Sequence, residues 1–289
     1  MSHAQEISNL SNLSNLSPAS EALLQACIDN YVQMFPVGLY PALLVHDGPD
    51  LAYRISGFPV APLNSVVRSI FDEETAEERI NKMFQEFQER QIPFNWLITP
   101  ESRPLDLKDR LLAQGMELDG ELIPMGRSLE NLPELQLPEG FHIEQVCTDR
   151  QLEDWAKVGQ VSFHLPPQAV EIRLAQFSRV LESDLWPVRL YVGSWEGQPA
   201  CTSGVRLTPG SAGLYFVGTL PGHTRRGLGT LMTLHPLLEA RKLGHRVGVL
   251  LSSRAGLKVY ERLGFERLGT FQIYTKEQAS VPQAAASSD

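Results

Sequence analysis

The chain has 289 residues, of which 43% are hydrophobic and 20% charged, and its formal net charge is −9. This length and composition are typical of a folded protein with up to two domains. The acidic balance argues against general binding to nucleic acids or to acidic membranes, because both need a basic protein surface. A polyanionic ligand would therefore have to be bound locally.

The cysteines and the ends of the chain indicate a cellular location. Cys27, Cys147 and Cys201 are far apart in the sequence and form no metal-type or redox-type pair. We expect reduced, mostly buried thiols and no bound metal. The chain starts without a basic and then apolar signal segment, and no apolar run approaches the roughly eighteen residues of a membrane span. The sequence therefore predicts a cytoplasmic protein without membrane partners.

Composition also divides the chain into segments. Residues 1–18 form a low-complexity lead rich in Ser, Asn and Leu, and residues 277–289 form a tail rich in Ala and Ser. Both are expected to be disordered. Prolines and a glycine interrupt any periodic pattern in residues 131–140, so we expect a linker there. It would join a first domain at 19–130 to a second at 141–276.

The first domain is predicted to mix helices and strands. Apolar residues at three- and four-residue spacing predict helices at 21–31, 74–90 and 105–114. Short apolar runs predict strands at 42–46, 51–55, 65–71, 94–99 and 121–127. Between the first two strands, Asp47-Gly48-Pro49-Asp50 is typical of a hairpin turn.

The second domain is predicted to follow a similar alternation. Strands are expected at 141–147, 188–193, 200–207, 212–220, 247–251 and 271–274, and helices at 149–159, 167–181, 226–243 and 255–263. Pro236 lies inside the third of these helices and is expected to kink it or to end its regular part early.

An internal repeat indicates that one fold is used twice. In each half a long helix is followed by a strand, a Ser-Arg pair, a leucine-spaced helix and a Gly-x-Glu turn. The long helix of the first half is preceded by Asp72-Glu73-Glu74, whose carboxylates suit the helix dipole but repel a phosphate. We therefore expect the first copy to be structural or to shape the substrate site.

The second long helix is preceded by a turn suited to an anion. Residues 217–230 read V-G-T-L-P-G-H-T-R-R-G-L-G-T and join an apolar strand to the helix. The first turn of a helix has free N–H groups and a partial positive charge. Gly227 and Gly229 let a ligand approach the backbone, while Arg225 and Arg226 add charge. These features predict a phosphate or pyrophosphate site, although glycines needed only for the turn would give a similar pattern.

Two motifs resemble those of the GNAT superfamily of acyl-CoA-dependent N-acyltransferases. T-R-R-G-L-G-T at 224–230 is similar to the family's [Gln/Arg]-x-x-Gly-x-[Gly/Ala] loop, and V-Y-E-R-L-G-F at 259–265 is similar to its closing helix and Gly-Phe turn. The order of elements from about 140 to 275 also fits. The resemblance implies an α/β (α+β) fold of two GNAT-like domains, each with a mixed, mostly antiparallel central sheet flanked by helices, the first domain being degenerate.

The resemblance also implies a site for acetyl-CoA as co-substrate. The pantetheine arm would pair with backbone groups where a bulge opens the sheet, and the pyrophosphate would meet the N–H groups of the turn. The implied cofactor-binding residues are Val217, Gly218, Thr219, Arg225, Arg226, Gly227, Leu228, Gly229, Thr230 and Ser253. Tyr260 matches the family's general acid, which protonates the departing CoA thiolate. A tyrosine packed in the last helix is the alternative.

This sequence departs from the family pattern at several positions. Thr224 stands at the Gln/Arg position, and Ser253 stands where many relatives have an asparagine. Gly248 stands where some relatives have a glutamate base. His164, His223, Glu171 or a chain of waters could accept the proton of the attacking amine. The resemblance implies that residues 161–185 wall the acceptor site. Phe163, His164, Glu171 and Phe177 could shape this wall, or they could simply pack or face solvent.

The leading hypothesis is an N-acetyltransferase that moves an acetyl group from acetyl-CoA to a primary amine of a small molecule or peptide. Direct attack is expected, because Cys201 has no obvious histidine partner and nothing else nominates a covalent nucleophile. A CoA-binding sensor or scaffold without turnover is the alternative from another class. A tRNA-dependent aminoacyl transferase is a third, although the acidic charge and the CoA-type loop count against it. The sequence leaves the acceptor, the acyl chain and the oligomeric state open.

Overall fold

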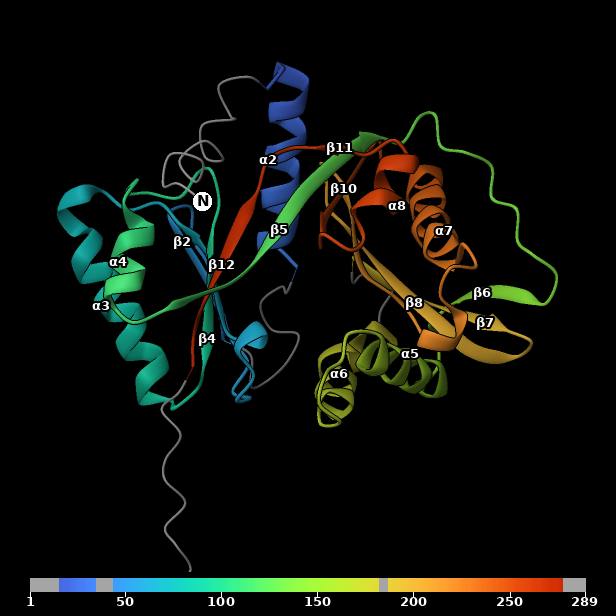
Figure 1. Ribbon diagram of the computed structural model, residues 1–289, viewed down its shortest axis with the longest axis horizontal. Helices are drawn as coiled ribbons and strands as arrows, with labels where there is room; N and C mark the ends of the chain where they lie inside the picture. The colour runs from blue at the N-terminus through green and yellow to red at the C-terminus, as the bar shows by residue number, and fades with distance from the viewer. Residues whose placement is uncertain (1–15, 35–43, 182–186, 278–289) are drawn as a thin grey trace, which may run out of the picture. The chain divides into compact units, whose positions relative to one another are not determined.

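A computed structural model of the protein describes residues 16–34, 44–181 and 187–277 (Figure 1). The chain divides into two compact units. What we call the C-terminal unit comprises Met1–Pro41 and Glu121–Phe271, and the N-terminal unit comprises Ala42–Gly120 and Gln272–Asp289. Each unit therefore contains a segment from the opposite end of the chain.

This division does not fall in the expected linker. Residues 131–140 contain neither helix nor strand, but the strands before and after them belong to the same sheet of the C-terminal unit. Of the two segments expected to be disordered, residues 1–15 and 278–289 lie outside the described residues. Pro18, placed at the end of the expected lead, is the first residue of a helix.

The N-terminal unit contains a mixed sheet. Its strand order is β1 (Leu44–Asp47), β2 (Leu51–Ile55), β3 (Ser65–Ser69), β4 (Phe94–Ile98) and β12 (Phe271–Lys276). β3 and β4 are parallel, and the other neighbours are antiparallel. Helices α3 (Glu73–Glu89) and α4 (Leu107–Ala113) follow β3 and β4 in the chain, and a short 3-10 helix, η3 (Ala61–Leu63), precedes β3. Met83 and Phe87 of α3 are buried in one core with Phe94 and Trp96 of β4.

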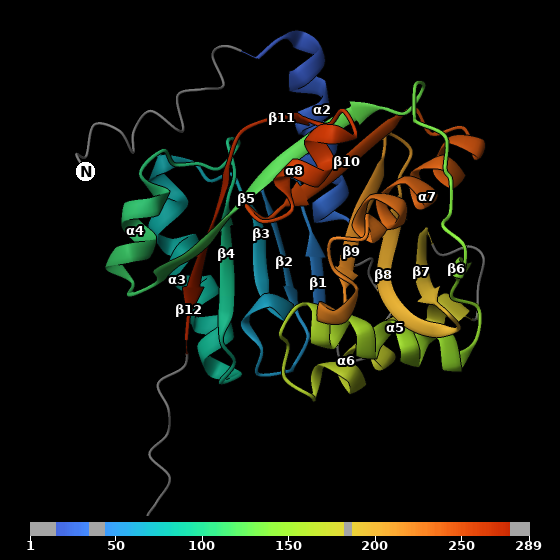
Figure 2. The same cartoon turned by 45° about the vertical axis from the view of Figure 1, so that its right-hand side comes forward.

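The C-terminal unit contains a second mixed sheet with helices on both faces. Its strand order is β5 (Glu117–Ser128), β10 (Val247–Ser252), β9 (Ala212–Thr219), β8 (Gln198–Leu207), β7 (Val188–Trp195) and β6 (Phe141–Gln145), and β11 (Glu266–Arg267) pairs with β5. α5 (Asp149–Ser162) and α6 (Ala169–Phe177) cover one face of β7–β9, and α7 (Leu228–Lys242) covers the other (Figure 2). The remaining helices are α2 (Pro18–Val32), α8 (Leu257–Arg262) and the 3-10 turns η4 (Ser178–Leu181) and η5 (Pro221–His223).

The predicted repeat is visible in the topology of both units. β3 and β4 are parallel strands joined through α3, and β9 and β10 are parallel strands joined through α7. An antiparallel strand flanks the second strand of each pair, β12 on β4 and β5 on β10. The predicted fold class, with mixed sheets flanked by helices, is confirmed.

Three details differ from the sequence-based predictions. α7 begins at Leu228 rather than near Arg226, because the residues before it adopt turn conformations. α7 continues through Pro236 to Lys242, so the expected early end is wrong. The buried side chains on both sides of the proline, among them Leu234 and Leu237, offset the loss of one helix hydrogen bond. The two-residue strand β11 carries no apolar pattern and was not predicted.

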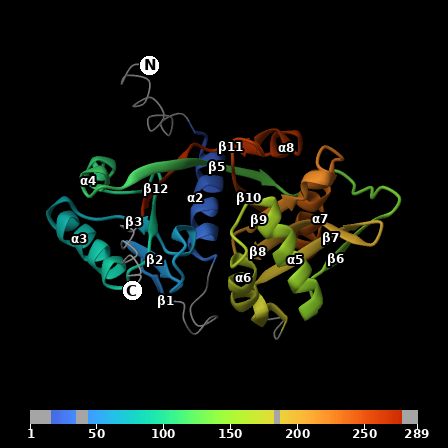
Figure 3. The same cartoon turned by 60° about the horizontal axis from the view of Figure 1, so that its bottom comes forward.

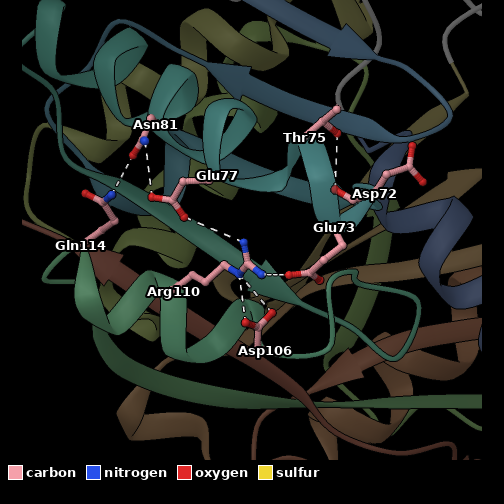
Figure 4. Close-up of polar contacts among 8 residues, drawn as sticks. All are labelled: Asp72, Glu73, Thr75, Glu77, Asn81, Asp106, Arg110 and Gln114. Atoms are coloured by element: carbon pink, nitrogen blue, oxygen red, sulfur yellow. Dashed lines mark hydrogen bonds and ion pairs between the residues drawn. The ribbon is translucent and has the colours of Figure 1, made fainter.

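The start of α3 shows what replaces an anion site in the N-terminal unit. Arg110 of α4 donates hydrogen bonds from Nε to Asp106 Oδ1 at 3.0 Å and from Nη2 to Glu73 in the first turn of α3 (Figure 4). Carboxylates therefore surround the positive end of this helix, where a phosphate would meet like charge.

In the C-terminal unit, α2 is attached to the sheet through a buried asparagine. Asn30 is fully buried, donates from Nδ2 to the carbonyl of Arg206 at 3.2 Å and to Ser211 Oγ at 3.0 Å, and accepts from the hydroxyl of Tyr215 at 2.8 Å. These bonds join the N-terminal segment to β8, β9 and the turn between them. Figure 3 shows α2 viewed from another side.

We expect Asn30→Ala to lower the free energy of unfolding by about 2–3 kcal/mol, because it leaves several buried polar groups without a hydrogen-bond partner. Denaturant unfolding measures this change. Gln25→Ala is the matched control on the same helix, since Gln25 shares an exposed hydrogen bond with Asp29. Equal stability of the two variants would show that the buried network contributes nothing.

Candidate active site

The parallel strands β9 and β10 pair over only part of their lengths. The paired positions are Gly248 with Ala212, Val249 with Gly213 and Leu250 with Leu214. β9 continues to Thr219 and β10 to Ser252, yet no further pair joins them in the described chain. The strands therefore separate beyond Leu214. Backbone groups on the two facing edges are left available for pairing with a ligand.

A bulge in β9 lies just beyond this point. Thr202 of β8 pairs with Gly218, whereas Gly204 pairs with Tyr215, so β9 contains one extra residue between the two pairs. Phe216 in this bulge has a φ of 57°, which is uncommon for a bulky residue. The hydroxyl of Thr202 donates to the carbonyl of Phe216 at 3.0 Å and stabilises the distorted backbone. A bulge thus occurs next to Val217, Gly218 and Thr219, the residues expected to border the pantetheine arm.

The turn before α7 has the conformation of an anion-binding backbone. Arg225 and Gly227 have φ values of 62° and 79°, and successive N–H groups in such turns converge on one point. In the described part of the chain, no acceptor is present for the N–H groups of residues 225–229, and the first bond runs from Thr230 N–H to the Gly227 carbonyl at 3.0 Å. No side chain caps the helix at Gly227. The turn therefore presents several unpaired donors together with the dipole of α7.

The two glycines of the turn have different requirements. Gly227 needs its positive φ, which side chains rarely tolerate. Gly229 has no positive φ, and a Cβ there would have no heavy atom within 4 Å. Nothing in the described structure requires a glycine at 229, although a glycine in a helix costs about 0.5–1 kcal/mol relative to alanine. Without a side chain at Gly229, the outer surface of the first helical turn stays open.

The side chains around the turn are arranged unequally. Arg225 and Arg226 are both exposed, and the guanidinium of Arg226 lies 5.0 Å from the ring centroid of Trp195. The hydroxyl of Thr224 donates to the carbonyl of Pro221 at 3.1 Å and is used within the turn. This bond accounts for the departure at 224, since a threonine there supports the turn rather than reaching outward.

Tyr260 of α8 lies close to the end of β10. A Cβ placed on Gly256 would lie 3.1 Å from Tyr260 Cε2 and 3.3 Å from Ser252 Oγ. The ring also packs edge-on against Phe265, with centroids 6.1 Å apart. Burial raises the pKa of Tyr260 to about 12, so the phenol keeps its proton at neutral pH. The side chain is thus partly packed, and it is protonated as a general acid must be.

Ser253 takes part in the turn between β10 and α8. Its carbonyl accepts from Gly256 N–H at 3.1 Å, and its hydroxyl accepts from the same N–H at 3.3 Å. The residue is exposed, and its hydroxyl stabilises this turn. A contact of Ser253 with a cofactor stays a prediction.

The candidate proton acceptors lie at different places. His164 is exposed, has a φ of 53° and follows the end of α5, while Glu171 is exposed on α6. His223 lies in η5, and its Nδ1 is buried without a hydrogen-bond partner among the described residues. Gly248 lies within the paired part of β10. These positions do not single out one base.

The end of α5 packs directly on β9 beyond the bulge. A Cβ on Gly218 would lie 2.8 Å from Ser162 Cβ and 3.1 Å from Phe163 Cζ, so only a glycine fits there. The structure therefore brings the start of the expected acceptor wall next to the bulge. Sequence reasoning missed Arg173 in this wall. Its only signal was a single basic residue within the apolar run A-V-E-I-R-L-A-Q-F of α6.

Two of the three cysteines are unsuited to nucleophilic catalysis. Cys27 and Cys201 are buried, and burial raises the pKa of each thiol to about 12. Cys147 is exposed. Across residues 16–34, 44–181 and 187–277, no group of three or more His, Cys, Asp or Glu side chains could hold a metal ion. Within the same ranges, no helix combines the length and apolar character needed to cross a membrane.

No family model matches the chain. A curated mycothiol acetyltransferase from Thermomonospora curvata is 29% identical over 170 residues, which cover 56% of this chain and 57% of that protein. The alignments with such curated relatives span less than two thirds of the relatives' length.

Solved structures resemble nearly the whole chain. A GCN5-related N-acetyltransferase from Kribbella flavida superposes with a TM-score of 0.67 at 18% identity, covering 89% of this chain and 97% of that one. A tandem GNAT protein from the clavulanic acid biosynthesis pathway gives a TM-score of 0.59 at 14% identity, with 89% and 97% covered. The chain therefore has the tandem fold of the GCN5-related N-acetyltransferases. The predicted resemblance to the GNAT superfamily is confirmed.

Proposed function

We propose that the protein is an N-acetyltransferase that transfers an acetyl group from acetyl-CoA to a primary amine of a small molecule or peptide. The observation that carries the proposal is the bulged, separating end of β9 beside the unpaired N–H groups at the start of α7. Relatives and structural neighbours that are named acetyltransferases support it.

The residues fit acetyl-CoA in two places. The anionic pyrophosphate would be bound by the N–H groups of residues 225–229 and by the charge of Arg225. The pantetheine amides would pair with the free edge of β9 at residues 217–219. The bulge changes the direction of the N–H groups there, so one of them would polarise the thioester carbonyl.

The chemistry then needs no covalent intermediate on the protein. The neutral amine attacks the thioester carbon, and the carbonyl oxygen takes up negative charge that backbone N–H groups stabilise. Collapse of this intermediate breaks the carbon–sulfur bond, and Tyr260 donates its proton to the thiolate. The attacking nitrogen loses one proton to water, and the phenol recovers a proton from solvent.

Release of CoA thiol tests the proposal. Acetyl-CoA is incubated with the full chain and a panel of amines, amino acids and peptides, and free thiol is followed with time. Release that depends on both protein and amine, together with an N-acetylated product by mass spectrometry, is the expected result. Binding of acetyl-CoA without release for any acceptor would instead support a sensor or scaffold. The cytoplasmic location and the absence of nucleic-acid and membrane partners stay predictions from the sequence.

A further inference from the structure

A partly buried arginine in the C-terminal unit is surrounded by aromatic rings. The guanidinium carbon of Arg173 on α6 lies 5.2 Å from the ring centroid of Trp155, 5.6 Å from that of Phe163 and 5.2 Å from that of Phe216. The rings come from the middle of α5, the residue that follows α5, and the bulge of β9. Such contacts are electrostatically favourable for a cation.

This cation has no anionic partner in the described part of the chain. Arg173 forms no ion pair there, and its Nη1 atom is buried without a hydrogen-bond partner. Burial lowers the pKa of Arg173 to about 10, so the group remains charged at neutral pH. A largely desolvated charge without a counter-charge is unfavourable, and aromatic contacts do not satisfy the N–H donors.

Packing alone does not account for an arginine at this position. A methionine or leucine would fill the same space among Trp155, Phe163 and Phe216 without an unpaired charge. α6 is otherwise mainly apolar on this side, with Ile172 and Phe177 buried. The arginine is therefore better explained by a ligand that pairs with its charge than by a contribution to the stability of the fold.

The three rings around Arg173 lie near the place where the proposed reaction would occur. Phe216 is part of the bulge, and Phe163 lies against Gly218, two residues further along β9. Two of the three rings around the guanidinium thus border the strand end at which the thioester would be polarised. Phe163 is 36% exposed and Arg173 itself is partly exposed, so the three rings do not close the guanidinium off from solvent.

We propose that Arg173 binds a carboxylate of the acceptor, so that the enzyme's substrates are amines that carry a carboxylate, such as amino acids or short peptides. A guanidinium matches the two oxygens of a carboxylate in a bidentate pair, which would include the unpaired Nη1 atom. Arg173 is in this view a specificity-determining residue. The inference rests on the proposed function and deepens it by naming the acceptor class.

Matched acceptors and variants test the proposal. The rate is measured for amino acids, for their amides and for the corresponding decarboxylated amines, with saturating acetyl-CoA. We expect the wild-type kcat/KM to favour the carboxylates by about 100-fold, the effect of losing a charged hydrogen-bonding partner. Arg173→Met should remove this preference through KM, Arg173→Lys should keep part of it, and the KM for acetyl-CoA should not change. Arg150→Met, which removes an exposed arginine of α5, is the control.

Two further measurements separate recognition from a structural role. The melting temperature of unliganded Arg173→Met should equal or exceed that of the wild type, because an unpaired buried charge is removed. N-acetylated amino acids with CoA should stabilise the wild type against heat but not Arg173→Met. The inference would be overturned if the wild type had the same kcat/KM for amides and carboxylates. It would also be overturned if Arg173→Met lost the same fraction of kcat/KM with every acceptor.

The two proposals fail in different ways. If no amine is acetylated, the proposed function is wrong, and the heat-stabilisation experiment still decides whether Arg173 binds carboxylates. Stabilisation that is the same in wild type and Arg173→Met would reject the carboxylate site by itself. If decarboxylated amines are acetylated as well as amino acids are, the acetyltransferase stands and the carboxylate preference is rejected.

Discussion

Replacing Tyr260 with phenylalanine is expected to lower kcat about 100-fold, the lower end of the usual contribution of a general acid. The change removes one oxygen and keeps the ring that packs against Phe265. The departing thiolate would then have to leave without a proton donor. The KM for acetyl-CoA should change little, because the hydroxyl acts on the leaving group and not on the bound pyrophosphate.

The pH dependence gives a second measure of the same role. The pKa of Tyr260 is raised to about 12 by burial, so the phenol remains a proton donor throughout the range in which the protein can be assayed. The wild-type rate should therefore rise with pH as the acceptor amine loses its proton and should show no alkaline fall below about pH 10. Wild-type rates in Tyr260→Phe would show that the tyrosine only packs. Tyr274→Phe, which changes a buried tyrosine of β12, is the control for loss of a phenol elsewhere.

Gly229→Glu is expected to weaken acetyl-CoA binding about 100-fold without weakening the fold. The new side chain meets no atom at its Cβ, and a carboxylate in the first turn of a helix favours the helix by about 0.3–1 kcal/mol. The same carboxylate would lie beside the unpaired N–H groups and repel the pyrophosphate. Glu73 already occupies the first turn of α3 in the N-terminal unit.

Calorimetric titration with CoA measures the affinity, and denaturant unfolding measures the stability. Gly210→Glu is the matched control, because it makes the same change at an exposed glycine where a Cβ also meets nothing. Gly210 lies in the turn between β8 and β9, before β9 begins, whereas the proposed pyrophosphate site is beyond the end of that strand. An unchanged CoA affinity in Gly229→Glu would remove the anion site from this turn.

The local parts of the candidate site could be predicted from the sequence, and the parts that depend on strand pairing could not. The turn at 224–230 and the helix that carries Tyr260 are contiguous, so their residues and spacing are visible in one stretch. The separation of β9 from β10 depends on which residues of distant strands pair, and an apolar run does not specify its register.

Arg173 shows the same limit for side chains. Its three aromatic neighbours are 10 to 43 residues away in the sequence, as the numbers of Phe163 (173 − 163 = 10) and Phe216 (216 − 173 = 43) show. An isolated arginine on an amphipathic helix usually faces solvent with its charge. Only the packing of α5, α6 and the bulge reveals that this one is enclosed.

The exchange of end segments between the two units affects the order in which the protein can fold during synthesis. β12 pairs with β4 from Gln272 with Ile98 to Lys276 with Phe94. The ribosome must therefore complete almost the entire second half of the chain before the first unit receives its last strand. Until then β4, an apolar strand, has one edge without a partner strand, and this edge can pair with strands of other chains. We therefore expect a chaperone to stay bound to the first half of the nascent chain for longer than to the second half.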